Sequence, residues 1–145
     1  MGPMSDEQGS FAAWRPWFYA AAAYNLAWGA VTILRPSLLF DALDIEPPNY
    51  LPLWQVVGMF VLVFAPAYWW AAHDPERHAH LIVIGMLGKL LGPIGFVWAV
   101  AFSDFPAIFG VTIVTNDLIW YPAFLSFLWR VAGARGGWRR LLSGE

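Results

Sequence analysis

Asn25, Lys89 and Asp117 each lie in the middle of a long apolar stretch, where polar side chains are rare. An aspartate and a lysine can carry charge or transfer a proton, and an asparagine can orient a bound group by hydrogen bonds. Asp117 and Lys89 are therefore the candidate catalytic residues. The candidate ligand-binding residues are deep amides and aromatics, namely Asn25, Asn116, Trp28, Trp120 and Tyr121.

The depth of these polar residues sets an energetic requirement. At 1.5 Å of rise per residue, Asn25 and Lys89 lie about 12 Å and Asp117 about 15 Å inside the predicted helices. Two unpaired charges would cost about 5–7 kcal/mol on insertion scales, which is comparable to the net stability of a whole protein. We therefore expect Lys89 and Asp117 to face the protein interior and to pair, directly or through water.

Two structural explanations compete with a working site. A helical side chain leans toward the N-terminus of its helix, so the long stem of Lys89 could carry its ammonium toward the membrane surface. Alternatively, the two charges fix the register of the helices and have no chemical role. The position of the Lys89 ammonium separates the first explanation from the other two.

The composition indicates a membrane protein. The 145 residues are 59% hydrophobic and 12% charged, whereas soluble domains have about 45–50% apolar and about 25% charged residues. This balance, with a net charge of -2, argues against a soluble enzyme, a nucleic-acid-binding protein and a disordered chain. Since the sequence has no cysteine, disulfides, thiolate catalysis and thiolate metal sites are excluded.

Four apolar stretches of about 18–23 residues match the length that crosses a hydrocarbon core of about 30 Å. We therefore predict an all-α integral membrane four-helix bundle, with residues 1–145 forming a single domain. The predicted spans are 17–34, 51–72, 81–102 and 107–129.

The basic residues predict the orientation of the bundle. Four spans place both termini on the same side as the central loop 73–80, and this side holds six of the eight basic residues. These six are Arg15, Arg77, Arg130, Arg135, Arg139 and Arg140. The opposite side holds Arg35 alone. By the positive-inside rule, both termini are expected in the cytoplasm.

Small residues indicate where the helices approach each other. One face of the first span combines small and polar side chains, which permit close packing and hydrogen bonds between helices. This face consists of Phe18, Ala21, Ala22, Asn25, Gly29 and Thr32. A stripe of four glycines follows one face of the third span beside Lys89, at positions 85, 88, 92 and 95. We interpret this stripe as a packing surface, with a ligand groove as the alternative.

Two prolines interrupt the hydrogen bonding of the third and fourth spans. Because proline has no N–H, Pro93 leaves the carbonyl of Lys89 without its helical donor, and Pro122 does the same for Leu118. In a membrane such carbonyls need another partner, which water, a side chain or a ligand can supply.

The two longer connections contain further candidate elements. Residues 36–50 predict a short amphipathic helix that includes Leu38 and Leu43 and is stopped by Pro47 and Pro48. In the 73–80 loop, the order Asp-Pro-Glu from Asp74 predicts a helix N-cap with proline at the first helical position. The alternative is a metal site formed with the neighbouring histidines, but we expect no metal.

The layout of four spans in 145 residues, with Asn25, Lys89 and Asp117 buried, resembles the small four-helix inner-membrane proteins of bacteria, in particular the DoxX-like group. More distantly, it is similar to the four-helix fold of sterol isomerases and the sigma-2 receptor. That fold holds lipid-like ligands over intramembrane carboxylates. The resemblance covers the layout over most of the chain, and it assigns no role to any individual residue.

The main functional hypothesis is the binding or processing of a lipid-soluble small molecule, such as a quinone, a sterol-like compound or an isoprenoid, at Asp117 and Lys89. The first alternative is a non-catalytic accessory subunit or homo-oligomer that uses the glycine stripe as its partner surface. The second, a proton or solute conductor, ranks last because polar residues mark only the outer half of a path. The expected partners are the lipid bilayer, the small molecule and another membrane subunit, but not nucleic acid. The sequence does not identify a cofactor, so the cofactor requirement stays unknown.

Overall fold

The structure is a computed structural model that describes residues 11–144, so most of the tail before the first predicted span lies outside it. The described residues form helices and the loops that connect them, with no strand among residues 11–144. The first half contains η1 (Ala12–Trp14), α2 (Arg15–Leu34), α3 (Leu38–Leu43) and α4 (Leu51–His73). The second half contains α5 (Ala79–Phe102), η2 (Ala107–Phe109), α6 (Gly110–Asn116), η3 (Leu118–Trp120), α7 (Tyr121–Ala134) and α8 (Trp138–Ser143).

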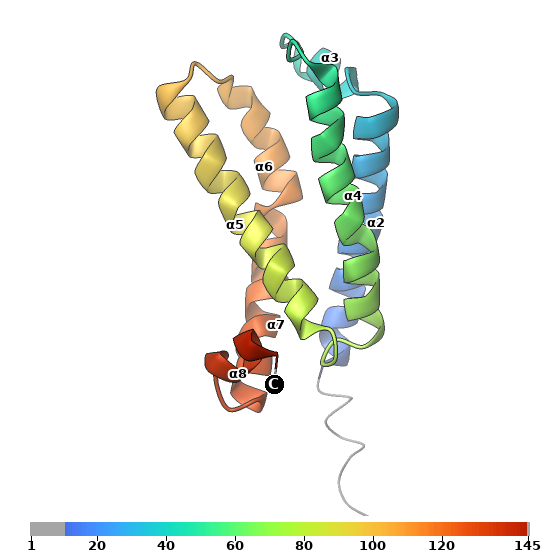
Figure 1. Ribbon diagram of the computed structural model, residues 1–145, viewed down its shortest axis with the longest axis vertical. Helices are drawn as coiled ribbons and strands as arrows, with labels where there is room; N and C mark the ends of the chain where they lie inside the picture. Colours follow the sequence, from blue (N-terminus) through green and yellow to red (C-terminus); the bar gives the residue numbers. More distant parts are fainter. Residues whose placement is uncertain (1–10, 145) are drawn as a thin grey trace, which may run out of the picture.

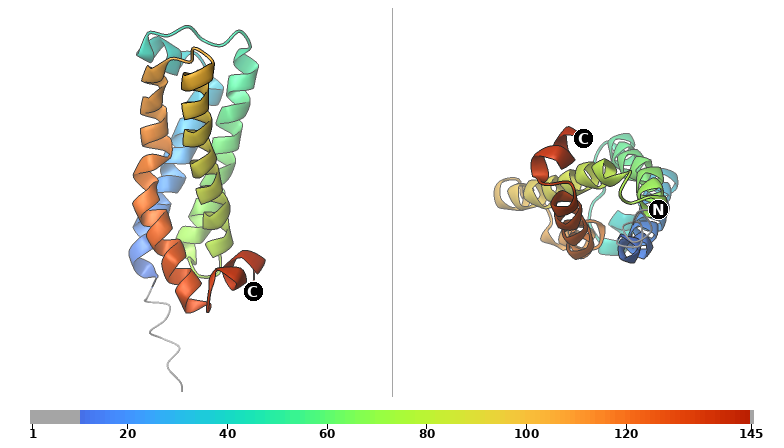
Figure 2. Two further views of the ribbon diagram at one scale, coloured as in Figure 1. Left: turned by 90° about the vertical axis from the view of Figure 1, so that its left-hand side faces the viewer. Right: turned by 90° about the horizontal axis from the view of Figure 1, so that it is seen from below.

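The long helices form two arms that converge at one end of the molecule and separate toward the other (Figure 1). The first arm is the antiparallel pair α2 and α4, and the second is α5 with the α6–α7 segment. The start of α2, the α4–α5 turn and the end of α7 all lie at the converging end (Figures 1 and 2). We call this the closed end, and the end that holds α3 and the α5–α6 connection the open end.

Three segments of the described chain are long and apolar enough to cross a membrane: Leu51–His73, Ala79–Phe102 and Ala107–Ala134. These segments correspond to the second, third and fourth predicted spans. The first predicted span exists as the helix α2, but it does not belong to this group. Its tryptophan, tyrosine, asparagine and threonine side chains lower the hydropathy of an otherwise alanine-rich sequence.

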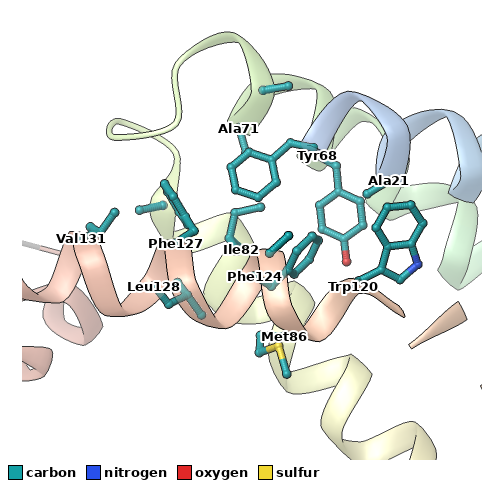
Figure 3. Close-up of a cluster of buried hydrophobic side chains, with 14 of the residues drawn as sticks. Ala21, Tyr68, Ala71, Ile82, Met86, Trp120, Phe124, Phe127, Leu128 and Val131 are labelled. Atoms are coloured by element: carbon teal, nitrogen blue, oxygen red, sulfur yellow. The ribbon is translucent and has the colours of Figure 1, made fainter. Parts of the chain in front are cut away.

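The main core lies at the closed end, where side chains from both arms meet (Figure 3). The ring of Phe18 on α2 meets those of Phe124 and Phe127 on α7 edge to face, with centroids 5.6 and 4.9 Å apart. Tyr68 on α4 contacts Phe124 in the same way at 5.2 Å. Aromatic pairs favour this geometry. The core therefore ties α2 and α4 to α7 at the closed end and fixes the angle between the arms.

Close backbone contact joins α2 to α4 within the first arm. The predicted packing face of the first span is confirmed, because its six residues are the buried residues of α2. Gly29 and Gly58 lie at the crossing, where a Cβ added to Gly29 would come within 2.7 Å of the Gly58 carbonyl oxygen. The side chain of Gln55 also donates to the Ile33 carbonyl at 2.7 Å. Since Gln55 is used in this helix contact, it gives no support to a conducting path.

At the open end, a second aromatic cluster connects the arms along one side. Phe40 on α3 and Trp54 on α4 both contact Phe109 of η2, with ring centroids 6.3 and 5.7 Å apart. The short helix predicted in the 36–50 connection is confirmed as α3. The prediction that Pro47 and Pro48 stop this helix is wrong, because α3 ends at Leu43 and Asp44 adopts the left-handed conformation. An aspartate tolerates that conformation better than most residues.

The 73–80 loop differs from the predicted helix N-cap. Helix α5 begins only at Ala79, and residues 74–78 form a turn. The Asp74 carboxylate accepts a hydrogen bond from the Arg77 N–H at 3.2 Å. A local hydrogen bond of this kind stabilises a turn as well as a helix start. The Asp-Pro-Glu motif therefore led to a predicted helix start that lies too early in the chain. Within residues 11–144, no three histidine or acidic residues are grouped so that they could hold a metal ion.

Candidate functional site

The fourth predicted span is a helix broken at its centre. The span predicted over 107–129 lies within the apolar segment Ala107–Ala134. This segment is interrupted, because α6 ends at Asn116 and Asp117 leaves the helical conformation with φ -120° and ψ -64°. A short 3-10 turn follows, and α7 then begins at Tyr121 with Pro122 in its first turn. Proline is tolerated there because the first helical N–H groups have no partner within the helix. The break therefore leaves the carbonyl end of α6 inside the protein.

Two side chains occupy the carbonyls that the break frees. The indole N–H of Trp120 donates to the Thr115 oxygen at 3.1 Å, and the Lys89 ammonium donates to the Asn116 oxygen at 2.5 Å. A cation is stabilised at this position because a helix carries partial negative charge at its C-terminal end. The carbonyl of Leu118, predicted to lack a donor, instead accepts the Tyr121 backbone N–H. The prediction for Pro122 was therefore wrong because the helix restarts before the proline.

The prediction for Pro93 is confirmed. The hydroxyl of Tyr121 donates to the Lys89 carbonyl at 2.7 Å, replacing the backbone donor that Pro93 lacks. Tyr121 is thus bound to the backbone of Lys89, while the side chain of Lys89 is bound to Asn116. These two hydrogen bonds fasten α5 to both sides of the helix break.

We expect Tyr121→Phe to lower the free energy of unfolding by about 1–2 kcal/mol, because a buried carbonyl loses its only donor from a side chain. Pro93→Ala restores a backbone N–H four residues after Lys89, so Tyr121→Phe should cost much less in the Pro93→Ala background. Unfolding in mixed detergent and dodecyl sulfate micelles, followed by circular dichroism, measures both effects. Equal losses of unfolding free energy in the two backgrounds would contradict the role of the Tyr121 hydroxyl as the donor that replaces the missing N–H of Pro93.

Lys89 is held deep within the protein. Only 4% of the residue is exposed, and its ammonium lies 5.8 Å from the ring centroids of Tyr68, Trp120 and Phe124. Aromatic faces attract a cation at such distances. The interpretation that Lys89 extends toward the membrane surface is therefore wrong. Its position is compatible with either an architectural role or a working site.

Asp117 lies close to Lys89 without touching it. The residue is 5% exposed, and its carboxylate rests against Gly92, where an added Cβ would lie 2.9 Å from Oδ2. Both charged side chains line the same cavity. No nitrogen–oxygen contact within 4.0 Å joins these two described residues, so the expectation of direct pairing is wrong. Pairing through water stays a prediction.

The cavity has a volume of about 200 Å³ and is lined by residues of both arms. The first arm lines it with Asn25 of α2 and with Phe60, Val61, Phe64 and Tyr68 of α4. The second arm lines it with Gly85, Gly88 and Lys89 of α5 and with Asn116 and Asp117 at the helix break. The polar groups thus gather at the break, and the apolar side chains lie mainly on α4.

Two amide oxygens in this cavity lack a donor. Asn25 is 3% exposed, and its Nδ2 donates to the Val61 carbonyl at 3.1 Å, which identifies the other amide atom as the oxygen. In the described part of the chain, neither Asn25 Oδ1 nor Asn116 Oδ1 has a hydrogen-bond partner. Buried polar atoms are nearly always hydrogen-bonded in native proteins. Both residues line the cavity, so these unpaired buried oxygens point to a donor that the chain itself does not supply.

The structure brings most of the sequence-predicted residues together. Four of them line the cavity, namely Asn25, Lys89, Asn116 and Asp117. Two others, Trp120 and Tyr121, do not line the cavity but contact Lys89. Trp28 lies elsewhere: its ring meets Trp54 at 5.6 Å, and it lines a groove between α2 and α3. The prediction of Trp28 as a wall of the same site is therefore not supported by its position.

Sequence reasoning missed the contribution of α4. Val61, Phe64 and Tyr68 follow one another at spacings of three and four residues, so they share one helix face that lines the cavity. This spacing was readable, but α4 has no charged residue in its interior that would draw attention to it. Tyr68 also packs against Gly85, where an added Cβ would lie 2.6 Å from the phenol oxygen. Gly85 therefore allows Tyr68 to approach Lys89.

A larger hollow of about 540 Å³ lies at the closed end, lined by Arg15, Arg77, Arg135 and acidic residues of the α4–α5 turn. Two of these arginines are already used by the fold. Arg15 donates to the Ala72 carbonyl at 2.8 Å, and Arg135 donates to the Glu76 carbonyl at 2.6 Å. Since acidic and basic side chains occur together here, the hollow favours no ligand of one charge. The cavity at the helix break is the better candidate site.

Comparisons with models of protein families, with curated proteins and with solved structures find no match for this chain. Its function therefore has to be inferred from the chemistry of the cavity.

Proposed function

We propose that this chain is an integral membrane protein that binds or processes a lipid-soluble small molecule in the cavity between its two arms. The proposal includes four spans in a bacterial inner membrane, with the closed end in the cytoplasm. The antiparallel contact of α2 along α4 supports α2 as the fourth span, since it places a helix of 20 residues beside one of 23 residues. The basic residues near the closed end support the orientation.

The observation that carries the proposal is the set of polar groups around the cavity. An amide from α2, a lysine from α5 and an aspartate from the α6–α7 break converge on one space of about 200 Å³. Groups that only fixed helix register would be expected to satisfy one another. Here two amide oxygens lack a donor and the two charges do not touch. A convergent set of unsatisfied polar groups in an apolar pocket is typical of a ligand site.

In this proposal each residue has a distinct role. Asp117 and Lys89 present opposite charges to the ligand and are the groups that would transfer a proton. Asn25 and Asn116 orient the ligand by hydrogen bonds. The aromatic wall consists of Tyr68, Phe64 and Phe60, and Trp120 supports the wall from behind Lys89. An aromatic and aliphatic wall suits a quinone, a sterol-like compound or an isoprenoid.

Native mass spectrometry of the purified protein in mild detergent tests the proposal, with decylubiquinone, cholesterol and farnesol as ligands. We expect at least one of them to bind with saturation. Asp117→Asn and Lys89→Met should each weaken that binding by about threefold to tenfold, which corresponds to roughly 0.7–1.4 kcal/mol. Equal binding by the wild type and both variants would remove the site.

A second candidate function, assembly with another membrane subunit or a second copy, is favoured by two glycines on α5. Gly88 and Gly95 are exposed, and among the described residues nothing lies within 4 Å of a Cβ added to either. Exposed small residues on one helix face are a common contact surface between membrane helices. If this surface mediates assembly, Gly88→Leu and Gly95→Leu should both give smaller species in the same native mass spectra. An unchanged mass in both variants would count against it.

A further inference from the structure

The free polar atoms of the cavity are mostly hydrogen-bond acceptors. Asn25 Oδ1 and Asn116 Oδ1 lack a donor within residues 11–144, and the Asp117 carboxylate lines the same space. The donors among the lining side chains include the Tyr68 hydroxyl and the Lys89 ammonium, which carries three N–H groups and gives one to the Asn116 carbonyl. A complementary ligand must therefore donate to an oxygen and, at the same time, accept from an ammonium.

The charges around the cavity further restrict the chemical class of the ligand. An ammonium ligand would have to lie beside Lys89, and a carboxylate ligand would have to lie beside Asp117 and the two amide oxygens. Either arrangement puts like charges, or unpaired acceptors, in contact within a buried site. A neutral hydroxyl avoids both, since it supplies one donor and two acceptor positions.

The size and walls of the cavity indicate where the rest of the ligand lies. Pockets that enclose a drug-sized molecule have volumes of about 300–1,000 Å³, whereas this cavity has about 200 Å³. It can therefore enclose a head group and only a short part of a chain. Between α2 and η3 the molecule is closed by the contact of Tyr24 with Trp120, whose ring centroids are 5.7 Å apart.

The side of the cavity that faces away from α2 and η3 lies between α4 and α5, and it is open. These helices diverge from the turn that joins them (Figure 1). Two lining residues on this side are exposed, Phe60 on α4 and Gly88 on α5, and Phe60 is 68% exposed. An apolar tail can thus leave the cavity between α4 and α5 and continue into the acyl chains of the bilayer.

We infer that the ligand is a long-chain lipid alcohol or phenol, which places its hydroxyl among Asn25, Asn116, Lys89 and Asp117 and its tail between α4 and α5. This inference rests on the proposed function and specifies its ligand class. The hydroxyl donates to one of the unpaired oxygens and accepts a hydrogen bond from the Lys89 ammonium. No bond of the ligand needs to break for this recognition.

Four ligands with one tail test the inference: farnesol, farnesyl methyl ether, farnesylamine and farnesoic acid, each titrated into the wild-type protein in mild detergent and measured by native mass spectrometry. We expect farnesol to bind at least tenfold more tightly than the methyl ether, which can accept but not donate, and more tightly than the two charged analogues. Asn25→Leu and Asn116→Leu should each reduce the preference for alcohol over ether. This ratio is measured within one protein, so a loss of stability does not imitate the effect.

The outcomes separate the inference from the proposed function. Equal binding of farnesol and its methyl ether would overturn the hydroxyl inference and leave a lipid-soluble ligand in place. Tightest binding of farnesylamine or farnesoic acid would overturn it in favour of a charged head group. If none of the four ligands, decylubiquinone or cholesterol binds with saturation, the proposed function itself fails.

Discussion

Gly88→Leu is expected to weaken binding of the preferred ligand by about thirtyfold, which corresponds to roughly 2 kcal/mol. Gly88 lines the cavity, and no described residue lies within 4 Å of a Cβ added there. The Cβ of a leucine therefore meets no neighbouring side chain, and the rest of its side chain can extend into the cavity and compete with the ligand for the same space. In the helix interior, a leucine also has a higher helix propensity than a glycine. The variant should consequently bind ligand poorly while its free energy of unfolding is unchanged or raised.

Gly95→Leu is the matched control for this prediction. Gly95 lies two helical turns further along α5, is equally free of described neighbours within 4 Å, and does not line the cavity. The same substitution should therefore change helix propensity in the same way and leave ligand binding intact. Ligand titration by native mass spectrometry and unfolding in dodecyl sulfate measure the two quantities. Normal binding by a stable Gly88→Leu variant would show that the ligand does not occupy this cavity.

The sequence was sufficient to predict the helices and most of the polar cluster, for a common physical reason. A charged or amide side chain in an apolar helix is costly, so the positions of Asn25, Lys89 and Asp117 already required that they lie in the interior. The buried face of α2 followed from its 3.6-residue period, since Ala21, Asn25 and Gly29 recur on one side. Helix lengths followed from the apolar stretches, apart from the break in the last one.

The helix break could not be placed from the sequence because several local preferences compete there. Pro122 predicts an interruption, but it does not determine whether the helix bends at the proline or ends before it. In the structure the interruption lies at Asp117, where Lys89 and Trp120 provide donors for the Asn116 and Thr115 carbonyls. Donors from α5 and η3 depend on the tertiary structure. The same dependence explains why Lys89 and Asp117 were expected to pair, directly or through water, whereas the partner found for the Lys89 ammonium is the Asn116 carbonyl.

The angle between the two arms could not be predicted from the sequence either. The glycine stripe on α5 was interpreted mainly as a packing surface, and the structure divides it into two kinds of position. Gly85 and Gly92 allow Tyr68 and Asp117 to approach closely, which agrees with packing. Gly88 and Gly95 face open space in the described structure. Which glycines pack depends on how far α5 leans away from α4, and this is set by the aromatic core at the closed end.

Gly29→Ala is expected to lower the free energy of unfolding by about 3 kcal/mol, the upper part of the usual range for overpacking. The added Cβ would lie 2.7 Å from both the Gly58 carbonyl oxygen and the Leu62 Cβ, and 2.9 Å from the Leu62 nitrogen. Backbone atoms of α4 cannot move away as a flexible side chain can, so α2 has to separate from α4. Gly95→Ala is the control, because apart from its chain neighbours and the adjoining backbone of α5 no described atom lies within 4 Å of its added Cβ. Unfolding in dodecyl sulfate, followed by circular dichroism, compares the two.

The effect of Gly29→Ala also bears on the topology. Small and polar residues make α2 less apolar than the three segments that could cross a membrane by composition, yet the same residues let it pack closely on α4. If α2 is the fourth span, its packing on α4 holds it in the bilayer. Loosening this contact should then expose α2 to a protease added to sealed vesicles of either orientation. Gly95→Ala should leave α2 protected. Loss of stability without a change in protection would mean that α2 packs on α4 but does not depend on this contact to remain in the membrane.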